Sequence, residues 1–257
     1  MRASGRNRQN MKPGKKTDLD SPAITIRRRS LVERKRFLKK IYGEWYQLLQ
    51  SALPENSAIN MELGSGSGVI DRFIPGTITS DIMTLPFVDV VLDGISLPVA
   101  SACLDSLLLV NVFHHIPDVR EFLHESVRVL KPGGRVIMIE PWVNSWSRWI
   151  YTNFHHEQLG ISYINWEFQT SGPLSGSNQA LPWIVFKRDI SDFEAEFPQL
   201  AIKTISPLMP VTYLLSGGFS TRLSFPGFMY RFWRWVEQKI LNSRKSGMFA
   251  LIVLERN

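Results

Sequence analysis

Two kinds of hydrophobic pattern follow each other along this chain. Over residues 31–52 the apolar side chains recur at helical spacing, with charged residues on the opposite face. This predicts an amphipathic helix that ends before Pro54. Beyond Pro54 the apolar residues come in short runs, and several of these end at an acidic residue or an asparagine. Continuous apolar runs are typical of strands that are buried on both faces. We predict strands at 57–63, 76–81, 88–93, 105–112, 135–140, 200–206 and 247–254.

Helices are expected between the later strands. Asp118 is followed three residues later by Glu121, an arrangement like a capping box, and residues 131–134 (KPGG) should end the helix that it starts. Further helices are predicted near 144–157 and over 228–241. Strands that alternate with helical or loop crossovers predict the α/β class, with a doubly wound and mostly parallel sheet.

Charge divides the chain into two parts. The first 40 residues hold 14 Lys and Arg against 3 Asp and Glu, whereas the other 217 residues hold 16 against 20. The net charge of +7 therefore results from +11 on the first part and −4 on the second. An acidic body lacks the clustered cations that neutralise phosphates, so nucleic acid is an unexpected partner. The single cysteine, Cys103, excludes a disulfide framework.

Residues 1–30 are predicted to be a disordered basic arm, because their few apolar side chains cannot offset the entropy of the chain. Two interpretations of the arm stay open: a solvated tail, which the composition favours, and a tether to an anionic surface. The chain has no apolar run of the kind that a secretory signal or a transmembrane helix needs. We therefore expect a cytoplasmic protein, with a peripheral position at the inner membrane surface as the alternative.

The strongest chemical signal is a glycine loop, residues 62–68 (ELGSGSG), directly after the first predicted strand. Glycines let the backbone pass close to a ligand, because they carry no Cβ. Asp81 ends the second strand, where a carboxylate can accept hydrogen bonds from both hydroxyls of a ribose. The third strand ends at Asp93-Gly94 and the fourth at Asn111-Val112. All four ends meet at the carboxyl edge of one sheet, where open α/β sheets bind their ligands.

Five collinear segments resemble the class I S-adenosylmethionine-dependent methyltransferases, in particular their type 11-like branch that acts on small molecules. The segments are 61–68 (MELGSGSG), 79–82 (TSDI), 88–98 (VDVVLDGISLP), 107–118 (LLLVNVFHHIPD) and 128–142 (RVLKPGGRVIMIEPW). The resemblance implies a seven-stranded Rossmann-like methyltransferase sheet, with an insertion after the fifth strand and a helical lid near the C-terminus. It also implies S-adenosylmethionine as the cofactor. The cofactor-binding residues that it implies are Glu62, Gly64, Ser65, Gly66, Gly68, Asp81, Ile82, Asp93, Gly94, Asn111 and Val112.

The resemblance assigns a part of the cofactor to each segment. Glu62 and the loop at 64–68 would hold the methionine moiety, and residues 81–82 would bind the ribose hydroxyls through the acid and the adenine through the isoleucine. Residues 93–94 would flank the adenine, and residues 111–112 would line the floor beneath the sulfonium. A structural role stays open for two of the acids, because Glu62 could cap its loop and Asp93 could form a turn.

The segment between Gly68 and Asp81 is shorter than this family usually has, which predicts an abbreviated first crossover helix. The alternatives to Asp81 as the ribose-binding residue are Ser80 and Asp71. Residues 31–257 are predicted to form a single methyltransferase domain. Its cofactor-binding core is expected at 55–142, and the cover over the acceptor site at 143–198 and 207–246.

Methyl transfer from a sulfonium is an in-line displacement, so the protein mainly aligns the reacting atoms. A base is useful only where the nucleophile must lose a proton. The candidates for catalysis are His114, His115, Glu140 and His156, and for each of them a structural role stays open. Glu140 ends the fifth strand and is expected to face the acceptor pocket. No metal site is predicted, since the adjacent His155 and His156 would point apart on a helix.

The predicted function is S-adenosylmethionine-dependent methyl transfer to a small or amphiphilic acceptor, with oxygen as the expected target atom. Helix 228–241 mixes aromatic residues with cations, which suits a core face or lid and also an interfacial membrane helix. A lipid-linked acceptor and a peripheral membrane contact would unite this helix with the basic arm. Two alternative functions remain: an RNA methyltransferase that uses the arm, and a non-catalytic cofactor-binding or scaffold protein. The first is disfavoured because Asn111 does not begin an Asn/Asp-Pro-Pro-aromatic tetrapeptide.

Overall fold

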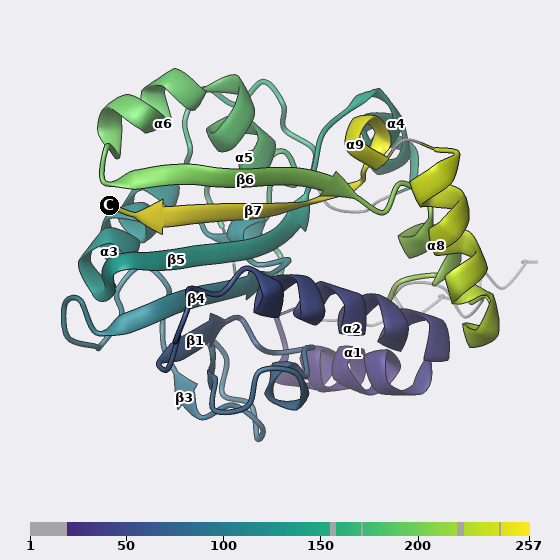
Figure 1. The fold of residues 1–257 in the computed structure, drawn as a ribbon, viewed down its shortest axis with the longest axis horizontal. Helices are drawn as coiled ribbons and strands as arrows, with labels where there is room; N and C mark the ends of the chain where they lie inside the picture. Colours follow the sequence, from purple (N-terminus) through teal and green to yellow (C-terminus); the bar gives the residue numbers. More distant parts are fainter. Residues whose placement is uncertain (1–19, 155–157, 171, 220–223, 242) are drawn as a thin grey trace, which may run out of the picture.

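A seven-stranded sheet with helices on both faces forms the centre of the protein (Figure 1). The computed structural model describes residues 20–154, 158–170, 172–219, 224–241 and 243–257. The strand order is β3-β2-β1-β4-β5-β7-β6, and β7 is antiparallel to both of its neighbours. This order confirms the predicted doubly wound, mostly parallel sheet. The strands are β1 (Asn60–Leu63), β2 (Ile78–Asp81), β3 (Val90–Val91), β4 (Leu104–Val110), β5 (Leu130–Pro141), β6 (Leu200–Leu208) and β7 (Phe249–Arg256).

Alternate residues of the central strands supply two hydrophobic cores, one on each face of the sheet. On β4, Leu107 and Leu109 pack into one core while Leu108 packs into the other. The continuous apolar run of this strand therefore reflects burial on both faces, as predicted. The first core is covered by α3 (Val119–Val129), α5 (Leu181–Trp183) and α6 (Ile190–Glu196). The second is covered by α2 (Arg36–Ser51), α4 (Ser145–Phe154), α7 (Thr212–Leu215) and α8 (Tyr230–Lys239).

The predicted cap of α3 is confirmed, because the Asp118 carboxylate accepts a hydrogen bond from the backbone N–H of Glu121 at 3.1 Å. The abbreviated crossover between β1 and β2 is also present, as a single 3₁₀ turn at Ile70–Arg72. A helix that precedes the sheet supports this connection. The Tyr46 hydroxyl of α2 accepts a hydrogen bond from the N–H of Val69 at 3.0 Å.

The prediction of a disordered arm over residues 1–30 is partly wrong. Residues 1–19 lie outside the described residues, but Pro22–Arg34 form a helix, α1, where a disordered segment was expected up to residue 30. Lys35 has extended backbone angles and separates α1 from α2, so the predicted helix at 31–52 is in fact two helices. The contacts of α1 explain the difference. The helix buries Thr25 and Val32 against the body, a gain that its low apolar content does not reveal.

Among the described residues, no helix is long and apolar enough to cross a membrane. The last short helix, α9 (Ser243–Ser246), leads into β7. In Figure 1, α1, α4 and α8 lie at the end of the molecule toward which β4 and β5 run. These helices therefore lie near the carboxyl ends of the parallel strands.

Candidate functional site

A cavity of about 580 Å³ lies at the carboxyl ends of β1, β2 and β4. Its walls come from many parts of the chain, including α1, α4, Thr170, residues 172–174, residues 213–214 and residues 217–219. Most of the predicted cofactor residues line this cavity, namely Gly64, Gly66, Asp81, Ile82, Asp93, Gly94, Asn111 and Val112. The other three do not line it: Ser65 and Gly68 are part of the glycine loop but face away from the cavity, and Glu62 is buried at the start of the loop. The topology therefore brings the four predicted strand ends to one place.

Two glycines of the loop occupy positions where a side chain would not fit. Gly64 has a φ of +63°, and a Cβ on it would come within 2.5 Å of the Val112 side chain. A Cβ on Gly66 would lie 2.8 Å from Oδ2 of Asp81. The loop therefore stays close to both neighbouring strand ends, as a backbone cradle requires.

Asp81 lies at the end of β2, where the sequence placed it. Its Oδ2 accepts a hydrogen bond from the N–H of Gly66 at 3.0 Å, and its Oδ1 accepts one from the N–H of Met83 at 2.9 Å. Burial raises the pKa of this carboxyl, against the lowering effect of these hydrogen bonds. The alternatives to Asp81 face elsewhere. The Ser80 hydroxyl donates to the Glu62 carbonyl at 2.7 Å, and Asp71 is exposed on the 3₁₀ turn.

Glu62 is buried behind the loop, and burial raises its pKa to about 7, although hydrogen bonds from Ser65 and Tyr46 favour the ionised form. Among the described residues its Oε2 has no hydrogen-bond partner. A carboxyl group in such a place is poorly solvated, and its charge is costly. Tyr46 also fills the space beside Gly68, because a Cβ there would lie 2.0 Å from its hydroxyl.

We expect the free energy of unfolding to fall as the pH rises from about 4.5 to 7, because folded Glu62 keeps a proton that the unfolded chain has lost. At pH 8 the cost should be about 3 kcal/mol, which Glu62→Gln removes. Urea denaturation of both proteins at pH 5 and pH 8 measures this difference. As a control, Glu255→Gln changes a surface carboxyl whose pKa Arg135 lowers. This variant should lose as much free energy of unfolding between pH 5 and pH 8 as the wild type does. If Glu62→Gln also loses as much as the wild type, Glu62 does not have a raised pKa.

Glu140, at the end of β5, holds the loop that follows β4. Its Oε1 accepts hydrogen bonds from the N–H groups of Val112 and Phe113 at 2.7 and 2.8 Å, and its Oε2 lies 2.6 Å from Nδ1 of His114. The loop begins at Asn111 with a left-handed φ of +57°. Glu140 is fully buried and does not line the cavity. The expectation that it faces the acceptor pocket is therefore wrong, because the loop N–H groups and His114 occupy both of its oxygens.

Both histidines of the 114–115 pair line the cavity. Because a carboxylate only accepts hydrogen bonds, the contact with Glu140 places the His114 proton on Nδ1 and makes Nε2 the basic nitrogen. Nδ1 of His115 donates to the carbonyl of Gly176 at 2.9 Å by the same argument. The fourth catalytic candidate, His156, lies outside the described residues.

Helix α1 covers the cavity, a role that the sequence did not indicate. The Asp20 carboxylate accepts hydrogen bonds from the N–H groups of Leu174 and Ser175 at 2.7 and 2.9 Å. Arg28 lies over the Phe219 ring at 5.5 Å, and Arg29 donates to the Gly68 carbonyl. The helix and the residue before its cap thus connect the glycine loop to residues 174–175 and to Phe219. The only feature of the sequence that could have indicated this role is the run of arginines at 27–29, which has no apolar pattern.

Residues 213–214, residues 217–219 and the start of β7 line the cavity, but α8 does not. The Nε of Arg234 in α8 donates to Glu44 of α2 at 2.9 Å, and Arg234 also contacts Glu237. The N–H of Val211 donates to Glu237 at 2.6 Å. The predicted helix at 228–241 therefore packs on α2, outside this cavity.

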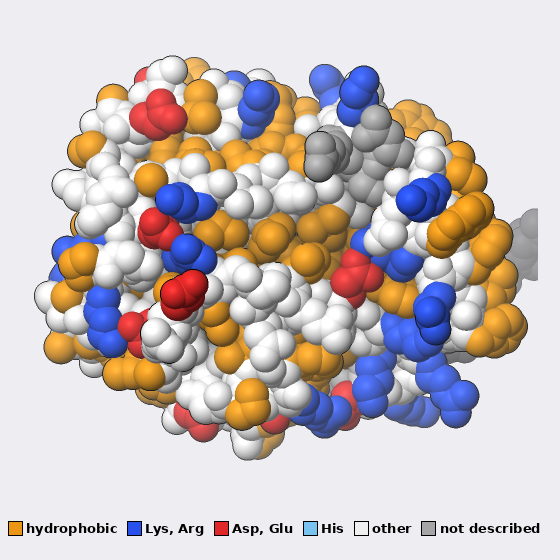
Figure 2. Space-filling view, viewed as in Figure 1, with side chains coloured by type: hydrophobic (Ala, Val, Ile, Leu, Met, Phe, Trp, Pro, Cys, Tyr) orange, Lys and Arg blue, Asp and Glu red, His pale blue; other side chains and the backbone are white. Residues whose placement is uncertain are grey.

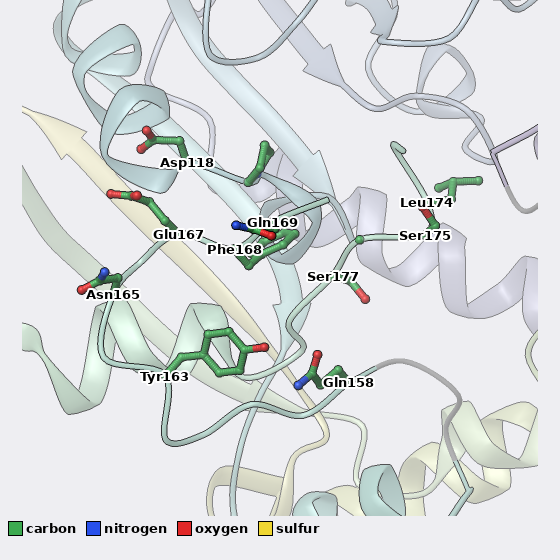
Figure 3. Close-up of a pocket in the computed structure, with 12 residues that line it drawn as sticks. Asp118, Gln158, Tyr163, Asn165, Glu167, Phe168, Gln169, Leu174, Ser175 and Ser177 are labelled. Atoms are coloured by element: carbon green, nitrogen blue, oxygen red, sulfur yellow. The ribbon is translucent and has the colours of Figure 1, made fainter. Parts of the chain in front are cut away.

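A second hollow, of about 870 Å³, lies beside residues 158–169, residues 174–177 and the start of α3 (Figure 3). Its walls are mostly polar and include Asp118, Gln158 and Glu167. Leu174 lines this hollow as well as the main cavity. The walls of this second hollow include neither the glycine loop nor Asp81, so the main cavity is the better candidate for a nucleoside cofactor. Over the described parts of the chain, no group of three His, Cys, Asp or Glu could hold a metal ion.

Comparison with known proteins identifies the fold and part of the domain. Residues 76–138 match a family described as a methyltransferase domain. No curated protein sequence matches the chain. Geranyl diphosphate C-methyltransferase from Streptomyces coelicolor A3(2), solved with Mg²⁺, geranyl diphosphate and S-adenosyl-L-homocysteine, is similar in structure. It has 14% identity and a TM-score of 0.51, and the match covers 86% of this chain and 80% of that one.

A second similar structure is the Haloferax volcanii complex between the Trm112 methyltransferase activator and a putative methyltransferase. The matching chain has 15% identity and a TM-score of 0.53, and the match covers 91% of this chain and 96% of that one. At these identities the similarity establishes the fold. The domain match, over residues 76–138, indicates a methyltransferase domain.

Proposed function

The chain carries the domain match and the fold of class I S-adenosylmethionine-dependent methyltransferases, and from this premise we propose that it methylates a hydroxyl group of a small, amphiphilic acceptor. The observation that carries the proposal is the pairing of His114 with buried Glu140 on the wall of the glycine-loop cavity. A histidine whose Nδ1 is fixed by a carboxylate is suited to accept a proton through Nε2.

The residues of the cavity suit S-adenosylmethionine. Asp81 offers a buried carboxylate for the ribose hydroxyls, and Ile82 offers an apolar surface, half of it exposed, for the adenine. Asp93-Gly94 would flank the adenine and Asn111-Val112 the reacting end. The glycine loop would hold the methionine moiety, with Glu62 as its buried support. When bound, the cofactor supplies an electrophilic methyl group.

The rest of the cavity supports an acceptor with an apolar part. Aromatic and aliphatic side chains from α4, α7, the start of β7 and the segments beside them form the wall beyond the cofactor-binding edge. An apolar wall with few polar groups favours burial of a hydrocarbon or ring system and leaves the polar groups to orient it. These side chains are Ile150, Tyr151, Phe154, Leu174, Tyr213, Leu214, Phe219, Met248 and Phe249.

His114 is the proposed general base. Its Nδ1–H bond to Glu140 leaves the proton-accepting role to Nε2, on a side chain that lines the cavity. Removal of a hydroxyl proton during methyl transfer makes the oxygen a better nucleophile. Glu140 acts through His114 and is a positioning residue.

The function is tested with S-adenosylmethionine labelled in its methyl group and with cell extracts separated into lipid, aqueous small-molecule and nucleic-acid fractions. We expect label in the lipid or small-molecule fraction, and NMR of the product should place the new methyl group on oxygen. Label in RNA alone would instead support the RNA methyltransferase. Cofactor binding without label in any fraction would support the non-catalytic alternative.

In the same assay, His114→Asn should lower turnover about a hundredfold, the scale of a lost general base. Glu140→Gln should have a similar effect, because its amide would donate to Nδ1 and move the histidine proton to Nε2. Cofactor affinity, measured by calorimetry, should stay unchanged in both variants. His124→Asn replaces an exposed histidine on α3 and is the matched control. If turnover of Glu140→Gln equals that of the wild type, with an unchanged pH profile, His114 is not the base.

A further inference from the structure

One face of α8 is fixed to the body. The Tyr230 hydroxyl donates to Glu44, and the Nε of Arg234 donates to the same carboxylate at 2.9 Å. Glu237, which is fully buried, accepts a hydrogen bond from the N–H of Val211 at 2.6 Å. These polar contacts set the rotation of the helix about its axis. The opposite face of α8 therefore points outward as a consequence of the fold.

That outward face carries Phe232 and Trp235, and large apolar side chains also stand at the two ends of the helix, Phe228 in the turn before it and Ile240 directly after it. We call these four residues, Phe228, Phe232, Trp235 and Ile240, the α8 aromatic face. Their exposed fractions are 80%, 55%, 54% and 63%. The rings of Phe232 and Trp235 stack with 6.5 Å between their centroids, so these two side chains are contiguous. Figure 2 shows hydrophobic side chains gathered along α8 at the right of the molecule. A contiguous patch of this kind marks an interaction surface more often than single exposed apolar residues do.

Cations border the aromatic face. Arg231 and Lys239 are exposed on α8 itself. From α2, Arg36 lies against Gly227, next to Phe228. Lys and Arg side chains also gather below the patch in Figure 2. Aromatic groups surrounded by cations match the acyl boundary and the anionic headgroups of a lipid bilayer. Two copies of such a cationic face would repel each other, which disfavours self-association.

The face is placed near the acceptor cavity. Helices α1, α4 and α8 lie at the same end of the molecule (Figure 1). Residues 213–214 and 217–219, which precede α8 in the sequence, line the cavity wall. A surface bound to α8 would therefore lie beside the end of the sheet at which the cavity lies.

We propose that the α8 aromatic face docks the protein on an anionic lipid bilayer, with the aromatic side chains in the interface and the bordering cations on the headgroups. This assignment concerns where the protein binds and does not depend on which atom is methylated.

The test is co-sedimentation of the full chain with vesicles of phosphatidylglycerol and phosphatidylcholine, and separately with vesicles of phosphatidylcholine alone. We expect binding to the anionic vesicles and weaker binding to the neutral ones. Phe228→Ser, Phe232→Ser and Trp235→Ser combined should weaken the binding at least about tenfold. Arg231→Glu and Lys239→Glu combined should also weaken it about tenfold, with a smaller dependence on salt.

Matched controls change equally exposed residues elsewhere. Ile164→Ser alters a side chain that is 90% exposed, and Lys187→Glu alters an exposed lysine beside α6, and both should bind as the wild type does. Failure of the full chain to bind anionic vesicles would overturn the proposal. Undiminished binding by the aromatic variant would also overturn it and would locate the attraction in the basic residues before α1. Light scattering that shows a dimer broken by the aromatic substitutions would instead make the face a contact between copies.

Discussion

Replacing Asp81 by alanine is expected to weaken the binding of S-adenosylmethionine about a thousandfold, since two hydrogen bonds to a charged group would be lost at once. The ribose hydroxyls would lose their acceptor. The glycine loop would also lose the hydrogen bond from Gly66 that holds it beside β2. Isothermal titration calorimetry with the cofactor measures the change directly.

The matched control for this experiment is Asp89→Ala. Asp89 is also an aspartate that accepts a backbone hydrogen bond, from Thr79 at 2.8 Å, but it is exposed and lies outside the cavity. Its replacement should leave the affinity within about twofold of the wild type, because surface carboxylates contribute little at a distance. If Asp81→Ala binds as Asp89→Ala does, the cofactor is not held at the end of β2.

Glu140→Ala should lower the free energy of unfolding by about 3–5 kcal/mol, the cost of removing one partner from a buried polar cluster. The N–H groups of Val112 and Phe113 would be left without their acceptor, and His114 would lose the group that orients it. Urea denaturation monitored by circular dichroism measures the loss.

For comparison, Glu255→Ala removes a carboxylate that pairs with Arg135 and Lys203 at the surface. Exposed ion pairs contribute at most about 1 kcal/mol, so this variant should remain close to the wild type. Equal losses in the two variants would mean that the hydrogen bonds of Glu140 do not hold the loop after β4.

The sequence predicted the features that depend on local pattern. The strand ends at Asp81 and Asn111 could be located because an apolar run stops where the polar residue begins, and the sheet topology then brings such ends together. Asp118 could be identified as a cap because its partner, Glu121, is three residues away. Local spacing is sufficient in each of these cases.

The features that sequence reasoning missed depend on contacts between distant residues. Nothing near Glu140 indicates whether its carboxylate faces the cavity or the loop, because its hydrogen-bond donors come from residues 26 to 28 positions earlier. Helix 228–241 has two apolar stripes. Which of them faces the body depends on the contact of Arg234 with Glu44, 190 residues earlier in the chain. The arm has too few apolar residues to reveal that Thr25 packs on the glycine loop.

The support of the glycine loop by α1 and α2 also bears on modularity. Tyr46 holds the loop through the N–H of Val69, Thr25 contacts it at Gly66 and Arg29 donates to the Gly68 carbonyl, yet all three precede the first strand in the sequence. The recognisable methyltransferase segments are therefore not a self-sufficient unit. An exchange of residues 55–142 with another member of the fold would transfer the glycines without the side chains that brace them. We therefore expect a chimaeric protein to keep the conformation of the glycine loop only if α1 and α2 are transferred together with residues 55–142.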